Sequence, residues 1–327
     1  MNGKKIVVTG GAGFIGRHLV QRLLSMKDDA SLTVLDNFSV GMKENLAAID
    51  MNGRKFDVVR GDVRDEKVLD KVLAGADIVY HMAAVVGVDR VLAMPEETWD
   101  VEVNGTRPLL EKCECFGVKR FFLASSSECY GKYDVSRLPM KESDEVVPNT
   151  NYGKAKLECE RMCVEYGSRG GMSCVGVRYF NVYGKLQSFN GYVIPNMIWQ
   201  ALNGEPVKIY GHGRQLRDFM YIDDAVCATI KLAESKVEGV YNVGAGKPVS
   251  IMNLAKMIIH LTGSKSQIMH VPIRRPTDIE SKSGDNTKIK EAVGWTPVHD
   301  IQSGLVKTIE NYKRCLDERS CNMCASG

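Results

Sequence analysis

The chain has 327 residues, of which 44% are hydrophobic and 25% charged, and its formal net charge is +3. This size and composition suit a globular protein of one large domain or two unequal ones. The charges are well mixed and no apolar run approaches the roughly 18 residues of a membrane span, so we expect neither a nucleic-acid nor a membrane partner.

Short apolar runs alternate with helical patterns through the first 180 residues. The first such pair is the strand pattern "KIVVTG" and the amphipathic helix pattern "FIGRHLVQRLLSM". Strand patterns recur at "SLTVLD", "FDVVRGD", "ADIVYHMAA", "VKRFFLASSS" and "SCVGVRYF", and helical patterns at 66–74, 100–116 and 152–168. The alternation predicts an α/β fold of the Rossmann type, a doubly wound parallel sheet with helices on both faces.

After about residue 181 the alternation loosens, and loops rich in Gly, Pro and Asn separate the elements. Helical patterns lie near 193–203, 222–234, 250–262 and 300–315, and "GVYNVG" predicts a strand near 239–244 that returns to the main sheet. We expect a smaller α/β lobe that packs over the carboxyl ends of the strands, where such sheets bind ligands. The expected boundaries are 1–180 for the Rossmann domain, 181–316 for the substrate-binding lobe and 317–327 for a polar tail.

The ten cysteines are scattered singly along the chain, apart from one Cys-x-x-Cys pair, Cys321 and Cys324. The first apolar run is interrupted by glycines too early for the core of a signal peptide. We therefore expect reduced thiols and a cytoplasmic protein. The pair lies in the polar tail with no second pair and no neighbouring histidine, so we expect no metal site there and leave its role open.

A glycine-rich turn joins the first strand pattern to the first helix pattern. "VTGGAGFIGRHL" places Gly10, Gly13 and Gly16 at three-residue spacing, which lets backbone N–H groups and the helix start approach a pyrophosphate. Asp36 ends the second strand pattern 20 residues after Gly16. A carboxylate at that place accepts hydrogen bonds from the adenosine ribose and repels a 2′-phosphate, so the pattern predicts NAD rather than NADP. Asp62, at the end of the third strand pattern, is a candidate adenine contact.

"NYGKAK" places Tyr152 and Lys156 four residues apart, on one face of a predicted helix. A tyrosine normally titrates near 10 and is a poor base at neutral pH, but a neighbouring ammonium favours the phenolate. This pair predicts a general base and acid at Tyr152, supported by Lys156, which can also hold the nicotinamide ribose.

With these motifs in place, the chain resembles the NAD-dependent nucleotide-sugar epimerase/dehydratase family of the extended short-chain dehydrogenases/reductases, and the UDP-sugar 4-epimerases most of all. The resemblance runs in order from residue 7 to about 278. The matching stretches are "TGGAGFIG", "LDNFSVG", "GDV", "HMAA", "NGT", "ASSSECYG", "YGKAK", "RYFNVYG", "RDFMYIDD", "YNVG" and "RRPTD".

The resemblance implies roles for the residues at matching positions. Ser126 resembles the residue that hydrogen-bonds the sugar 4-hydroxyl, Tyr152 the base that takes its proton, and Lys156 the lysine that tunes this base. Further implied cofactor contacts are Gly10, Gly13, Phe14, Ile15, Gly16, Asp36, Asn37, Phe38, Ser39, Gly41, Asp62, Val63, Met82, Ala83, Ala84, Asn104 and Phe180. Implied contacts of the nucleotide sugar are Ser126, Ser127, Asn181, Val193, Arg217, Arg275 and Asp278.

The implied reaction oxidises C4 of a nucleoside-diphosphate sugar, with uridine as the expected base, and then returns the hydride to the opposite face of the 4-keto sugar. NAD is regenerated in each cycle. The resemblance also implies a homodimer that pairs through the helices at 100–116 and 152–168.

Glu128, in "ASSSECYG", leaves an alternative open. In 4,6-dehydratases and UDP-glucuronate decarboxylases of this family the position resembles a glutamate, and in dehydratases that glutamate removes the C5 proton. Glu128 is therefore a catalytic candidate. The stretches "LDNFSVGMKENL" and "AAVVGVDRVLAMP" resemble epimerases more, which favours C4 epimerisation with a structural Glu128. A non-catalytic NAD(H)-binding scaffold is the alternative of another class; the presence of Ser126, Tyr152 and Lys156 argues against it.

Overall fold

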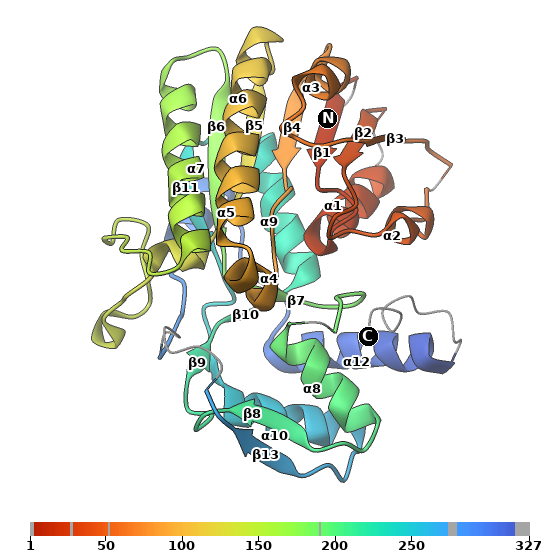
Figure 1. Ribbon diagram of the computed structural model, residues 1–327, viewed down its shortest axis with the longest axis vertical. Coiled ribbons are helices and arrows are strands. Elements are labelled where there is room, and N and C mark those ends of the chain that lie inside the picture. The colour runs from red at the N-terminus through yellow and green to blue at the C-terminus, as the bar shows by residue number, and fades with distance from the viewer. Residues whose placement is uncertain (1–2, 27–28, 52, 190, 274–279, 318–327) are drawn as a thin grey trace.

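Seven parallel strands form one sheet in the order β11-β6-β5-β4-β1-β2-β3 (Figure 1). The computed structural model describes residues 3–26, 29–51, 53–189, 191–273 and 280–317. Side chains alternate across the sheet, so that Ile6 and Val8 of the first strand enter one core and Val7 enters the other. The strands are β1 (Lys5–Thr9), β2 (Ser31–Asp36), β3 (Asp57–Arg60), β4 (Ile78–His81), β5 (Arg120–Ser126), β6 (Ser173–Tyr179) and β11 (Gly239–Val243).

Helices cover both faces of this sheet, as the sequence predicts. On one face α1 (Phe14–Ser25) packs beside α9 (Ile222–Glu234). On the other face α3 (Glu66–Leu73), α6 (Gly105–Cys115) and α7 (Asn151–Ser168) lie next to one another. Shorter elements of this body are α2 (Lys43–Ala47), α4 (Val88–Ala93), α5 (Pro95–Trp99), the π-helix η1 (Asp100–Asn104), and the 3₁₀ turns η2 (Ser127–Tyr130) and η3 (Val135–Arg137).

The strand order reverses between β1 and β4. From β1 the chain moves outward through β2 and β3, and from β4 it moves the other way through β5 and β6. The loops that follow β1 and β4 therefore separate at the carboxyl edge of the sheet and leave a crevice, which is where doubly wound sheets bind ligands.

A smaller lobe lies beyond that edge (Figure 1). Its parallel pair β8–β13 and the helices α8 and α10 form the part farthest from the main sheet. The remaining elements are α8 (Val193–Leu202), α10 (Ile251–Thr262), α11 (Thr287–Val293), α12 (Ile301–Asp317), β7 (Asn181–Tyr183), β8 (Val207–Tyr210), β9 (Leu216–Arg217), β10 (Phe219–Tyr221), β12 (Val249–Ser250) and β13 (Ile268–Val271).

The boundary between the two parts is less simple than a cut at residue 180. Strand β11 pairs with β6 at the edge of the main sheet, where the sequence predicts a returning strand. Helix α9 packs against α1, β5 and β6, so this helix covers the main sheet although it lies within residues 181–316. We propose that the smaller lobe consists of residues 181–316 without α9 and β11.

Asp218, between β9 and β10, connects segments that are distant in the sequence. Its side chain is fully buried, and its carboxylate accepts hydrogen bonds from the backbone N–H groups of Ala245 (2.7 Å), Gly246 (3.1 Å) and Gly284 (3.0 Å). Burial raises the pKa of Asp218, and these three N–H groups partly offset the rise. The carboxylate thus fixes the loop after β11 and the segment before α11 against the start of β10.

Within the described residues, no helix combines the length and the apolar character that crossing a bilayer requires. Eight cysteines of this part of the chain are free thiols, and Cys321 and Cys324 lie outside the described residues.

We predict that Asp218→Ala lowers the free energy of unfolding by about 3 kcal/mol, because three buried N–H donors lose their acceptor. Urea unfolding followed by circular dichroism measures the change. Asp223→Ala is the control: Asp223 is also acidic and lies five residues onward, but its side chain is 43% exposed, and its loss should change stability by about 0.5 kcal/mol or less. Equal losses in the two variants would contradict the role assigned to Asp218.

Candidate active site

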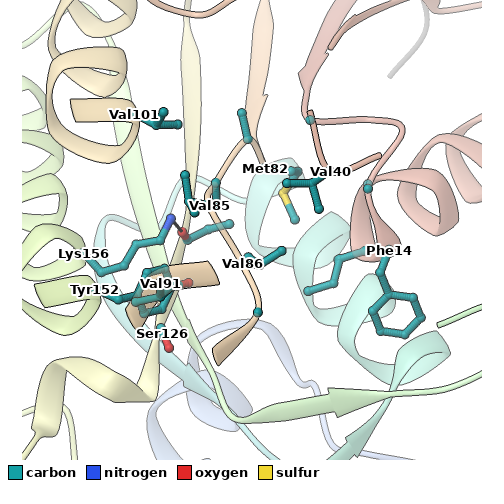
Figure 2. A pocket seen from close by; sticks show the side chains of 18 of the residues that line it. Phe14, Val40, Met82, Val85, Val86, Val91, Val101, Ser126, Tyr152 and Lys156 are labelled. Atoms are coloured by element: carbon teal, nitrogen blue, oxygen red, sulfur yellow. Dashed lines mark hydrogen bonds between the residues drawn. The ribbon is translucent and has the colours of Figure 1, made fainter. Parts of the chain in front are cut away.

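A cavity of about 600 Å³ opens at the crevice between the two halves of the sheet. Figure 2 shows Ser126, Tyr152 and Lys156 together on one side of it, while Phe14, Val40 and Met82 lie on the other. One end is therefore formed by the glycine turn after β1, and the other by the ends of β5 and α7.

The turn after β1, at the first end of the cavity, requires glycine at position 10. Gly10 has φ 68°, a conformation that L side chains rarely adopt, and a Cβ there would lie 2.5 Å from the backbone nitrogen of Ala83. The turn leads into α1, whose N-cap is Gly13. Free N–H groups at a helix start form a binding site for phosphate groups. These features fit the pyrophosphate of a dinucleotide.

Asp36 lies at the end of β2 and is 8% exposed. Its carboxylate accepts hydrogen bonds from the backbone N–H of Ala12 (2.9 Å) and of Phe38 (2.8 Å). Burial raises the pKa of Asp36, and these two N–H groups partly offset the rise. A carboxylate has about four lone-pair sites, so acceptors remain for a ribose diol.

Asp62 lies next to it along the cavity wall. The carboxylate is bound by Arg64 (2.8 Å) and accepts a hydrogen bond from Asn37 (2.9 Å). Arg64 above all lowers the pKa of Asp62 to about 2, so the group is ionised at neutral pH. With Asp36 and the glycine turn, this end of the cavity fits the adenosine diphosphate half of NAD.

The end of β5 holds the candidate catalytic serine. The chain turns from Ser126 into the 3₁₀ turn η2, and the Ser126 hydroxyl oxygen accepts a hydrogen bond from the N–H of Glu128 (3.2 Å). The hydroxyl proton remains free to be donated to a ligand. Gly153 in the first turn of α7 lets η2 approach, because a Cβ at Gly153 would lie 2.5 Å from the backbone oxygen of Glu128. This close approach holds Tyr152 near Ser126.

Lys156 lies one helical turn after Tyr152 and is only 2% exposed. Its ammonium donates a hydrogen bond to the backbone oxygen of Ala124 (2.8 Å) and forms an ion pair with Glu102 (2.7 Å). It also lies 5.7 Å from the centre of the Tyr152 ring. Burial lowers the pKa of Lys156, but the charges of Glu102 and Tyr152 outweigh burial and hold it above the ordinary value.

The pKa of Tyr152 differs from the expectation drawn from Lys156 alone. Burial raises it, Lys156 lowers it, and Glu102 raises it again, so that the net shift is upward. The Tyr-x-x-x-Lys spacing reveals the ammonium but neither the burial of the phenol nor the carboxylate of Glu102. Ionisation of the phenol is therefore more costly here than the Tyr-x-x-x-Lys spacing suggests.

His81 lies behind the site with 1% exposure, between the hydroxyls of Thr9 (2.7 Å) and Thr106 (3.0 Å). Burial and then the charge of Lys156 lower its pKa to about 3, so it is neutral at physiological pH. It joins β1, β4 and α6 and is suited to positioning rather than to acid–base chemistry.

Glu128 lines the cavity and forms an ion pair with Lys282, a residue 154 positions onward that is 4% exposed. This carboxylate is thus neutralised by a cation from the segment before α11. Of the described residues that line the cavity, the other carboxylates are Asp36 and Asp62, both at the adenosine end.

Most residues expected at the site line the cavity. Four do not. Asn104 is exposed and donates a hydrogen bond to Asp100 (2.7 Å), and Phe38 donates its backbone N–H to Asp36 (2.8 Å). Val193 starts α8, and Arg217 is buried and donates to the backbone oxygens of Leu216 and Glu280. These four residues do not line this cavity, and their contact with a ligand stays a prediction. Arg275 and Asp278 lie outside the described residues. The expected residues that do line the cavity are Gly10, Gly13, Phe14, Ile15, Gly16, Asp36, Asn37, Ser39, Gly41, Asp62, Val63, Met82, Ala83, Ala84, Ser126, Ser127, Glu128, Tyr152, Lys156, Phe180 and Asn181.

Two charged residues at the site were missed from the sequence. Glu102 is a carboxylate between Val101 and Val103 in a helical pattern, and a charge on an apolar face was the available signal. Lys282 carries no such signal, because it meets Glu128 only through the tertiary fold.

In the described part of the chain, no group of three or more His, Cys, Asp and Glu side chains is arranged to hold a metal ion.

A model of the NAD dependent epimerase/dehydratase family matches residues 6–244. The chain belongs to this family. NAD is accordingly its cofactor, and the residues around Gly10 and Asp36 are those that would hold its adenosine diphosphate half.

Relatives within this family differ in the reaction they catalyse. A UDP-N-acetyl-alpha-D-glucosaminuronate decarboxylase of Bacillus cytotoxicus is 33% identical over 324 residues, covering 95% of this chain and 98% of the relative. A UDP-N-acetylglucosamine 4-epimerase of Methanobrevibacter ruminantium, solved with UDP-N-acetylmuramic acid, is 33% identical with a TM-score of 0.89, covering 96% of this chain and 99% of that one. MoeE5, solved with UDP-glucuronic acid and NAD, is 32% identical with a TM-score of 0.85, covering 95% and 99%. The chain thus belongs to the part of the family that contains epimerases, dehydratases and decarboxylases.

We predict that Asp36→Asn lowers the preference for NAD over NADP at least about tenfold, because the charge that repels a 2′-phosphate is lost. Calorimetric titration with both dinucleotides measures the ratio of the two dissociation constants. Asp57→Asn is the matched control, since Asp57 is an exposed carboxylate on the neighbouring strand β3. An unchanged ratio in the Asp36 variant would show that this carboxylate does not meet the ribose.

Proposed function

We propose that the protein epimerises a UDP-linked sugar at C4 through a 4-keto intermediate. The observation that carries the proposal is the grouping of Ser126, Tyr152 and Lys156 on one wall of the cavity, at the end away from the adenosine site. A hydroxyl donor, a phenol and an ammonium in this order form a path for removing a proton from a sugar hydroxyl. The uridine base is inferred from the UDP-sugar relatives.

In this mechanism Tyr152 takes the proton of the C4 hydroxyl, and Ser126 orients that hydroxyl. NAD, when bound, supplies the group that accepts the hydride and later returns it. Lys156 supports the charge that develops on the phenol. The 4-keto sugar then turns over in the cavity, Tyr152 gives the proton back to the C4 oxygen, and the product is the C4 epimer.

The Glu128–Lys282 ion pair supports epimerisation over dehydration. A 4,6-elimination needs a base at C5 and an acid for the departing 6-hydroxyl, and among the described lining residues Glu128 is the one carboxylate at the sugar end. Its charge is already matched by Lys282. We therefore assign Glu128 a structural role, in which it holds the segment before α11 against the end of β5.

A second candidate is decarboxylation of a UDP-hexuronate, and the feature that favours it is the Lys282 ammonium beside Glu128. Once C4 is oxidised, a carboxylate on C5 is β to the ketone and can leave as CO₂ with its bonding electrons passing to the ring. A substrate carboxylate that replaced Glu128 beside the Lys282 ammonium would be held at that position. The relationship to a UDP-N-acetylglucosaminuronate decarboxylase is consistent with this reaction.

The homodimer remains a proposal as well. Helices α6 and α7 pack side by side, and exposed apolar side chains lie on α7 (Val164) and just after α6 (Phe116). These two helices are the candidate pairing surface.

We predict that the protein, incubated in deuterated water with UDP-glucose, UDP-N-acetylglucosamine, UDP-glucuronate, and dTDP- and GDP-hexoses, inverts C4 of a UDP sugar without incorporating deuterium. Nuclear magnetic resonance of the products measures both outcomes. Tyr152→Phe should lower the rate about a thousandfold, since the proton acceptor is lost. Loss of CO₂ with deuterium at C5 would instead establish the second candidate, and loss of water would contradict both.

We also predict that Glu128→Gln costs less than about tenfold in kcat, because a structural carboxylate is not consumed in the reaction. Lys282→Gln removes the partner charge and should give a similarly small loss. A thousandfold loss in the Glu128 variant alone would make Glu128 an acting base. A large loss for UDP-glucuronate alone in the Lys282 variant would indicate that Lys282 binds a substrate carboxylate.

A further inference from the structure

Glu102 is buried in the π-helix η1, directly behind the catalytic candidates. Its exposure is 1%, whereas Asn104 of the same turn is exposed. π-Helical turns are rare and occur often at functional sites. Thr106 and Cys159 both hydrogen-bond to the backbone oxygen of Glu102, at 2.5 Å and 3.2 Å. The turn is thus fixed to α6 and to α7.

Both oxygens of the Glu102 carboxylate are in use. Oε1 accepts a hydrogen bond from the backbone N–H of Val85 (2.9 Å), in the loop after β4 that lines the cavity. Oε2 forms an ion pair with the Lys156 ammonium (2.7 Å), and the ammonium donates a hydrogen bond to the oxygen of Ala124 (2.8 Å). Ala124 and Glu102 thus hold the ammonium from two directions, and a donor is left for the side of Tyr152 and the cavity.

We propose that Glu102 is a positioning residue for proton transfer at Tyr152: it fixes the Lys156 ammonium and offsets the charge of that ammonium beside the phenol. This inference rests on the proposed function, because it concerns the same tyrosine. A buried ion pair is costly unless both charges have further partners, and here Val85 and Ala124 supply them. These partners stabilise the carboxylate in its buried position beside the site.

The charges around the phenol determine in which direction Glu102 shifts the pKa of Tyr152. Lys156 lowers the pKa of Tyr152, whereas Glu102 raises it. A phenol with a higher pKa holds its proton more firmly once it has taken it from the sugar. Glu102 thus favours the state in which the sugar is a ketone and Tyr152 is protonated, the state that both candidate reactions must pass through. The other titratable groups that face Tyr152 or Lys156 are Cys129, Tyr192, Cys159 and His81.

The test is Glu102→Gln, which keeps the shape and an acceptor for Val85 but removes the charge. The ammonium then acts on Tyr152 unopposed, so the acid limb of the kcat/KM profile should move to lower pH, on the order of one pH unit. We expect kcat to fall about tenfold with KM within about twofold, as for an effect on the chemical step. Glu102→Asp keeps the charge farther from Lys156 and should shift the limb by less.

Two controls separate this role from a merely structural one. Glu111→Gln removes a charge from the exposed face of α6 and should leave the acid limb in place. The ionisation of Tyr152 can be followed without substrate, as the ultraviolet absorbance of ionised tyrosine in each protein minus that of its Tyr152→Phe counterpart. The Gln variant should ionise at lower pH than the unmodified protein.

An acid limb and a tyrosine titration that are both unchanged in Glu102→Gln would overturn the proposal. If that variant does not fold, Glu102→Asp decides alone, and an unchanged profile there has the same consequence. If the unmodified protein converts no nucleotide sugar, the proposed function fails, while the absorbance titration still tests Glu102.

Discussion

The Lys156 ammonium is a charge held almost entirely away from water, and this constraint organises the site around it. A buried cation is tolerated only with partners that replace its hydration. These contacts join three parts of the fold, because Lys156 belongs to α7, Ala124 to β5, and Glu102 to the π-helix before α6. Satisfying one ammonium therefore fixes the strand end that carries Ser126, the helix that carries Tyr152 and the helix beside them.

Residues 280–285 of the smaller lobe make two contacts that connect this lobe to the centre. Lys282 reaches Glu128 at the end of β5, and Gly284 donates its N–H to Asp218. Both contacts involve a buried charge. Breaking either contact would cost free energy, because the buried charge would need water or another group as its partner. The segment follows the stretch that the family resemblance assigns to nucleotide binding. Its two contacts fix this segment to the end of β5 and to the start of β10.

The local parts of this arrangement could be predicted from the sequence, and the long-range parts could not. The glycine turn at Gly10 and the spacing of Tyr152 and Lys156 are patterns within a few residues, and the positions of Asp36 and Ser126 follow from strand ends. Asn104 does not line the cavity, because residues two apart in a helix lie on nearly opposite faces and an inward Glu102 turns Asn104 outward. Lys282 is 154 residues from its partner, and no local pattern marks that contact. The upward pKa shift of Tyr152 depends on burial and on Glu102, which are also properties of the assembled fold.

Epimerisation and decarboxylation share their first half, so the elements around Tyr152 cannot distinguish between them. Both need the C4 proton and hydride removed and a ketone held until they return. The difference lies in what meets C5 while the ketone exists. With the Glu128–Lys282 pair closed, that region is electrically neutral, and a neutral sugar can rotate there without leaving a charge unpaired. With the pair opened by a substrate carboxylate, Glu128 would lose its cation in a partly buried place, at a cost of solvation. The contact between a hexuronate and Lys282 must offset that cost, whereas an uncharged hexose leaves the ion pair closed and incurs no such cost. This asymmetry is the physical reason for preferring the neutral sugar and the C4 epimerase.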